Sequence, residues 1–232
     1  MKLRTQLFAA TVLAAATAST YAASSVSLEV KGTLGTPACT IALDDSGVVT
    51  FDDIARTILS STDPTGIGSK KINANVSCSG ITLIALKVED NRAASRPTAA
   101  MKFKFQPGGN GPDETNLQTT HYFSFSTDET TPVGLASFAI RVEKIKVDTV
   151  EIAGVRMGSD YAAMNGATYA NFTHVKPSEL VAPYAAGINV PSSGRDFVFP
   201  LEIAASVMST YHIPSAAEIV LKGDATVSVV YL

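Results

Sequence analysis

The chain has 232 residues, of which 46% are hydrophobic and only 17% are charged, and its formal net charge is −3. Without clustered Lys and Arg side chains to contact phosphates, this composition argues against a nucleic-acid partner. Val, Thr, Ser and Ala are abundant and Trp is absent, which is typical of β-strands rather than of amphipathic helices.

The first 22 residues have the pattern of a bacterial signal peptide. Lys2 and Arg4 precede an apolar run over 7–18, and small residues mark a cleavage site after Ala22. The run is too short to span a bilayer. We therefore predict export through the inner membrane to the periplasm, with residues 23–232 as one mature domain.

The two cysteines, Cys39 and Cys78, are expected to form a disulfide bond. An even number of cysteines in an oxidising compartment indicates pairing, and two cysteines allow only one pair. Closure of this loop contributes roughly 3–4 kcal/mol in the chain-entropy model. The alternative, two separate buried thiols, is unusual in an exported chain.

Period-2 alternation of apolar and polar residues predicts about nine strands separated by turn clusters. The first is one long strand from Val26 to Leu43, kinked near Gly35 and Pro37. The other expected strands are 48–51, 71–78, 81–88, 101–105, 122–125, 136–142, 145–155, 197–205 and 218–232. Such spacing favours a β-sandwich. Residues 108–191 are weakly periodic in part, and we expect a long irregular insertion there.

The stretch 221–232 alternates clearly, and its odd-numbered residues form one apolar face. Two interpretations are open for its far edge. The strand pairs within its own sheet, or another chain supplies the missing neighbour. The residues of this face are Leu221, Gly223, Ala225, Val227, Val229 and Tyr231.

The sequence shows no clear motif for catalytic chemistry. His121, His174 and His212 are not at metal-ligand spacing with other ligand residues. No G-x-S-x-G motif is present, and the glycine-rich stretch 108–111 lacks the Lys-Ser/Thr of a phosphate-binding loop. We expect neither an enzyme nor a metal or small-molecule cofactor.

Three anchors together resemble the pilin subunits of the chaperone–usher pathway. The first is the strand that leads through Val30 and Gly32 to Cys39. The second is the strand that carries Cys78, and the third is the closing strand with Gly223 and the penultimate Tyr231. The stretch 108–191 lies outside these anchors and makes the chain longer than an ordinary major pilin.

The resemblance implies an immunoglobulin-like β-sandwich that lacks its final strand. In that family a periplasmic chaperone lends a strand beside the closing strand, and the N-terminal extension of another pilus subunit later replaces it. The resemblance also implies an outer-membrane usher as a partner and a cell-surface fimbrium as the final location, with a role in adhesion. The odd-numbered face of 221–231 is then one wall of an acceptor groove.

The chain departs from the family pattern at its N-terminus. Val26, Leu28 and Val30 alternate as a donor strand does, but they also continue into the expected first strand. We therefore expect a subunit that accepts a strand better than it donates one. An alternative function is a secreted ligand- or carbohydrate-binding β-sandwich. Its candidate aromatic residues in the middle segment are Tyr161, Tyr169, Phe172 and Tyr184.

Overall fold

The computed structural model describes residues 27–32, 35–126, 134–168, 170–213 and 220–232. The chain divides into two units, Met1–Gly35 and Thr36–Leu232. The expected signal peptide over 1–22 and the candidate donor residue Val26 lie outside the described residues. Within the described part, no helix has the length and apolar character needed to cross a membrane.

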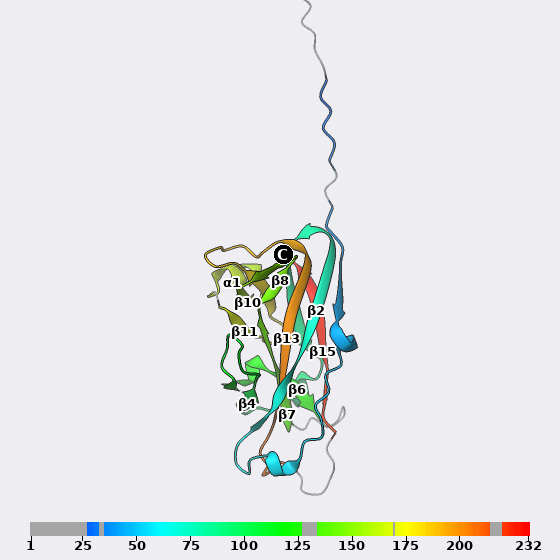
Figure 1. Ribbon diagram of the computed structural model, residues 1–232. Coiled ribbons are helices and arrows are strands. Elements are labelled where there is room, and N and C mark those ends of the chain that lie inside the picture. Colours follow the sequence, from blue (N-terminus) through cyan, green and yellow to red (C-terminus); the bar gives the residue numbers. More distant parts are fainter. Residues whose placement is uncertain (1–26, 33–34, 127–133, 169, 214–219) are drawn as a thin grey trace, which may run out of the picture. The chain divides into compact units, whose positions relative to one another are not determined.

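Apart from one short helix and four 3-10 turns, the regular elements described in the second unit are antiparallel strands, so the prediction of an all-β protein is confirmed (Figure 1). The described residues form a nine-stranded sheet with the order β1-β2-β13-β7-β6-β14, in which β8 joins β13, β9 joins β8, and β11 joins β7. Its strands are β1 (Cys39–Leu43), β2 (Thr65–Thr82), β6 (Phe123–Ser126), β7 (Ala136–Glu143), β8 (Ile145–Val147), β9 (Val150–Ile152), β11 (Phe172–His174), β13 (Gly194–Val207) and β14 (Lys222–Gly223).

A smaller sheet has the order β10-β12-β3-β15. Its strands are β3 (Ile84–Asp90), β10 (Gly154–Gly158), β12 (Leu180–Tyr184) and β15 (Ala225–Tyr231). A separate hairpin joins β4 (Met101–Lys104) and β5 (Glu114–Leu117), and α1 (Tyr161–Gly166) follows β10. Four 3-10 turns complete the described elements, namely η1 (Asp44–Gly47), η2 (Arg56–Ile58), η3 (Ala93–Ser95) and η4 (Thr119–His121).

The main core lies between the two sheets. On β2 the alternating residues Ile72, Ala74, Val76 and Cys78 are buried, as the sequence pattern predicted. They meet Leu86 and other side chains of the smaller sheet in one apolar cluster. The two antiparallel sheets therefore share one apolar interior.

The outer face of the larger sheet is also covered. Met101 and Phe103 of β4, together with Tyr122, pack on Ala139 of β7 and Ala204 of β13. As a result β13 is buried on both faces from Leu201 to Val207. This third layer was not foreseen from the sequence, where the alternation of β13 suggested one exposed face.

The expected irregular insertion over 108–191 is wrong, whereas the strands expected within it at 122–125 and 136–142 correspond to β6 and β7. This segment supplies the strands from β5 to β12, and β7 lies next to β13 over seven paired positions, Leu201↔Val142 to Val207↔Ala136. Its strands β8, β9 and β11 have only three residues each, and the left-handed residues Lys144 and Asp148 flank β8. Strands of that length show too little alternation to be recognised by period.

The ends of two predicted strands also differ. The expected long first strand is reduced to Cys39–Leu43, and residues 27–32 form no strand. The closing strand is divided at Asp224, because Gly223 pairs with Phe125 of the larger sheet whereas Ala225 pairs with Asp90 of the smaller one. One continuous apolar pattern in the sequence therefore spans both sheets.

Candidate functional site

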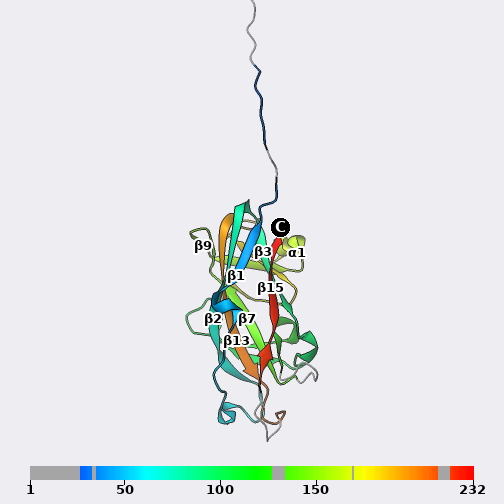
Figure 2. The same cartoon turned by 90° about the vertical axis from the view of Figure 1, so that its right-hand side faces the viewer.

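An apolar groove runs between β1 and β15, the two strands that lie side by side in Figure 2. Each of them pairs with one neighbour among the described strands, β1 with β2 and β15 with β3. The cavity between them has a volume of about 150 Å³. Its lining residues come from both walls and from the sheet behind, namely Leu43, Gly47, Val49, Phe51, Ile72, Phe125, Phe138, Ile140, Leu201, Ile203, Gly223, Ala225 and Val227.

The structure distributes the six predicted wall residues along the groove. Gly223, Ala225 and Val227 line the cavity directly. Val229 packs against the main core one step further along β15. The other two lie beyond the cavity, since Leu221 belongs to a separate apolar cluster with Leu135 and Ile213, and Tyr231 lies at the opposite end.

The outer edge of β15 carries backbone groups without a strand partner in the described chain. The Leu232 N–H donates to the Leu83 carbonyl at 3.2 Å, so even-numbered positions bond to β3. Alternate residues of an antiparallel strand point their N–H and C=O groups to the other side. The backbone N–H and C=O groups of the odd-numbered residues therefore point toward the groove. These residues are Ala225, Val227 and Val229.

The facing edge belongs to β1 and has the same property. The Ser79 N–H donates to the Ala38 carbonyl at 2.9 Å, so even-numbered positions bond to β2. The backbone groups of the odd-numbered residues point toward β15. These residues, Cys39, Ile41 and Leu43, also place partly buried side chains against the core.

A turn after β1 extends this wall beyond the strand. The Asp44 carboxylate accepts hydrogen bonds from the Asn73 backbone N–H at 3.0 Å and from the side-chain amides of Asn73 and Asn75 at 2.8 and 2.9 Å. After this turn the chain no longer pairs with β2, and Val49 and Phe51 continue the wall of the groove. Sequence reasoning missed this wall, although the alternation of Cys39, Ile41 and Leu43 was a usable signal.

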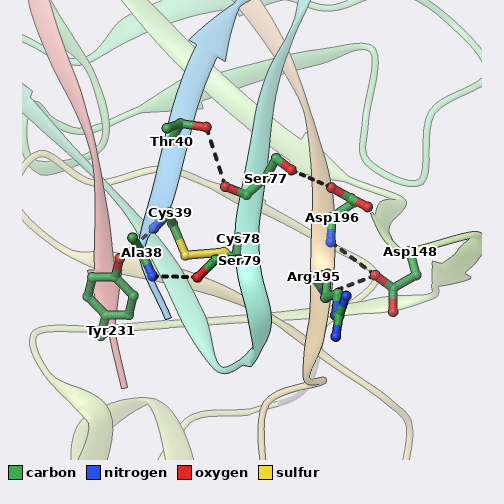
Figure 3. The surroundings of a disulfide bond; sticks show 10 residues. All are labelled: Ala38, Cys39, Thr40, Ser77, Cys78, Ser79, Asp148, Arg195, Asp196 and Tyr231. Atoms are coloured by element: carbon green, nitrogen blue, oxygen red, sulfur yellow. Dashed lines mark hydrogen bonds between the residues drawn. A yellow bond between two sulfur atoms is a disulfide. The ribbon is translucent and has the colours of Figure 1, made fainter. Parts of the chain in front are cut away.

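The predicted disulfide between Cys39 and Cys78 is confirmed, and it joins β1 to β2 at one end of the groove (Figure 3). The two residues are direct partners in the ladder, with their Cα atoms 4.0 Å apart. At the same end the Tyr231 hydroxyl accepts a hydrogen bond from the Cys39 backbone N–H at 2.8 Å. The bridge therefore fixes the short strand β1, which has only five residues.

The candidate donor segment lies outside every described sheet. Leu28 is 88% exposed and Val30 is 84% exposed, and the Lys31 and Glu29 side chains form an exposed ion pair at 3.0 Å. These residues were expected to continue into the first strand, but that strand begins only at Cys39. The apolar side chains of Leu28 and Val30, two residues apart, are thus exposed to solvent within the first unit.

A buried charged cluster lies on the covered face of the larger sheet, away from the groove. Arg141 is fully buried and forms an ion pair with Glu202 at 2.7 Å. The Arg141 guanidinium also donates to the carbonyls of Gln106 and Pro112, and the Gln106 N–H donates to Glu202 at 2.6 Å. This arrangement holds the glycine-rich loop after β4 in place, which is a structural role.

Two pKa values report on the same cluster. Burial lowers the pKa of His174 to about 4, and the Arg141 guanidinium adds to this effect. Burial opposes ionisation of Glu202, but hydrogen bonds from Ser69, the Gln106 N–H and Arg141 leave its pKa below the usual value. Both shifts follow from a charged network that is excluded from water.

The aromatic residues considered for carbohydrate binding are not gathered on a surface. Tyr184 is fully buried and Phe172 is partly buried, whereas Tyr161 is 39% exposed. Tyr169 lies outside the described residues. In the part of the chain that the structure covers, no group of three or more His, Cys, Asp or Glu side chains is placed to hold a metal ion.

The chain is similar to a bacterial protein over nearly its whole length. It is 29% identical over 240 aligned residues to "Uncharacterized protein YhcF" of Escherichia coli (strain K12), with 92% of this chain and 93% of that protein covered. Residues 28–134 match the model of a family described as "Protein of unknown function (DUF1120)". The family match includes β1 but ends before β15, so it covers only one of the two groove walls.

Proposed function

We propose that this chain is a non-catalytic fimbrial subunit of the chaperone–usher type, whose groove between β1 and β15 accepts a β-strand from another chain. The observation that carries the proposal is the pair of unpaired strand edges that face each other across an apolar cavity. A strand placed there gains backbone hydrogen bonds on both sides and buries alternate side chains.

The order of the strands supports an immunoglobulin-like sandwich with an open position. Taken in chain order, β1, β2, β3, β7, β13 and β15 correspond to strands A to F of that fold. The sheet orders β1-β2-β13-β7 and β3-β15 then match its ABED sheet and two strands of its CFG sheet. The position of strand G lies beside β15, where the groove is.

The exposed segment with Leu28 and Val30 is our candidate for the donor. Its alternating aliphatic side chains suit a groove that takes every second side chain, and they are not used in the sheets of their own chain. We therefore propose that the subunit both accepts and donates a strand. This replaces the sequence-based expectation of a subunit that accepts a strand better than it donates one.

The proposed partners are a periplasmic chaperone, an outer-membrane usher and other pilus subunits, with a surface fimbrium that serves adhesion as the final location. The test is periplasmic expression with and without a candidate chaperone. We expect the chain alone to aggregate or to be degraded, and the chaperone to co-purify with it. A C-terminal fusion of an alternating apolar strand should give a soluble monomer. A stable monomer from the unmodified chain alone would refute the proposal.

A further inference from the structure

The groove is closed at one end by a side chain. The Tyr231 phenol reaches from β15 to the first residue of β1, where its oxygen lies 2.8 Å from the Cys39 nitrogen (Figure 3). The Cys39 N–H belongs to the edge of β1 that faces the groove, so the phenol takes a position that a paired strand would otherwise occupy. The residue is 44% exposed, and its ring is therefore not sealed in the core.

The closed end is also firmly anchored. Cys39 is tied to Cys78 by the disulfide, and the preceding Ala38 N–H donates to the Ser79 hydroxyl at 3.0 Å. Both contacts hold the start of β1 on β2. Tyr231 consequently bonds to a fixed point on the larger sheet rather than to a free strand end.

At the opposite end, the described residues leave the groove continuous with a second hollow. Gly47 and Gly223 line the cavity there, and the Phe138 ring packs directly against Gly223. Phe51 and Phe125 line both this cavity and an adjoining hollow of about 790 Å³. The groove thus differs at its two ends, with a hydrogen-bonded phenol at one and a wider mouth at the other.

We propose that Tyr231 limits the length of the strand that the groove accepts. The inference rests on the proposed strand-accepting function, with the N-terminal segment of a second copy as the occupant. Such a strand enters from the Gly223 end, pairs along β15 and stops at the phenol. The five residues from Ala225 to Val229 rise about 17 Å and leave room for about three inward side chains. Leu28 and Val30 supply two of them.

Labelled peptides provide the test, and each is present while the full-length chain refolds at high dilution under oxidising conditions, before the chain can aggregate. The first peptide has the sequence of residues 25–31, Ser-Val-Ser-Leu-Glu-Val-Lys. Two further peptides carry an extra Val-Ser dipeptide at the N-terminus or at the C-terminus. Dissociation constants are measured for the wild type, for Tyr231→Ala, and for Tyr211→Ala as a control at an exposed tyrosine.

We expect one extension to tighten binding to the wild type about tenfold through added backbone hydrogen bonds, and the other to change it less than about twofold. In Tyr231→Ala both extensions should tighten binding, while Tyr211→Ala should behave as the wild type. Equal gains from both extensions in the wild type overturn the inference even if Tyr231→Ala does not fold, and leave the proposed function intact. If no peptide binds the wild type, the proposed function fails, and the inference fails with it.

Discussion

Val227→Asp is the substitution that probes the groove most directly. Val227 lines the cavity and is only partly buried while the groove is empty. A carboxylate there keeps contact with water in the free chain, so we expect a loss of about 1–2 kcal/mol in unfolding free energy. An inserted strand would remove that water, and burial of an unpaired charge costs several kcal/mol. About 4 kcal/mol corresponds to a thousandfold weaker strand binding.

Ser228→Asp is the matched control for this experiment. It introduces the same charge one residue further along β15, on the opposite face, where Ser228 is the ladder partner of Lys87. The assay compares strand affinity and recovery of a chaperone complex for the two variants. If Val227→Asp binds a strand as tightly as Ser228→Asp does, then Val227 does not face an inserted strand and the assignment of the groove is wrong.

Three further predictions concern stability and are each checked by urea unfolding of the soluble C-terminal strand fusion, because the chain alone is expected to aggregate. Substitution of Cys39 and Cys78 by Ala should lower the unfolding free energy by about 3–4 kcal/mol. Glu202→Gln should cost about 3–5 kcal/mol, because the Arg141 guanidinium would stay buried without its ion-pair partner; an unchanged midpoint would contradict this. The folded pKa of His174 is about 4 and the unfolded value is near 6.5, so stability is complete above pH 6.5 and falls by up to about 3 kcal/mol as the pH drops to 4. His174→Phe should remove this fall.

The parts of the fold that could be predicted are those with long, regular alternation. The buried residues of β2 follow the period of two, as do the inward residues of β13 from Phe197 to Ile203. The cysteine pair was predictable because two cysteines in a chain that is expected to be exported allow only one pairing. Three of the six predicted wall residues, Gly223, Ala225 and Val227, line the cavity. They could be predicted because the strand alternates regularly.

The rest depended on contacts between residues far apart in the sequence. Arg141 and Glu202 look like exposed positions of alternating strands, but the hairpin of β4 and β5 covers that face and buries them. The opposite wall of the groove was hidden because the Asp44 turn interrupts the alternation between Leu43 and Val49. Local pattern carries no information about which distant segment will cover a face.

The direction of the two groove edges has a consequence for assembly. Cys39 lies beside Tyr231 at the closed end, whereas Leu43 lies with Gly223 and Ala225 in the cavity, so β1 and β15 run in opposite directions. An inserted strand is therefore parallel to one edge and antiparallel to the other. The chain enters β1 at the closed end, while the proposed acceptor opens at the opposite end. In the assembly proposed above, the closed end of one subunit would meet the open end of another. Such a contact is heterologous, and heterologous contacts build filaments when their rotation does not close a ring.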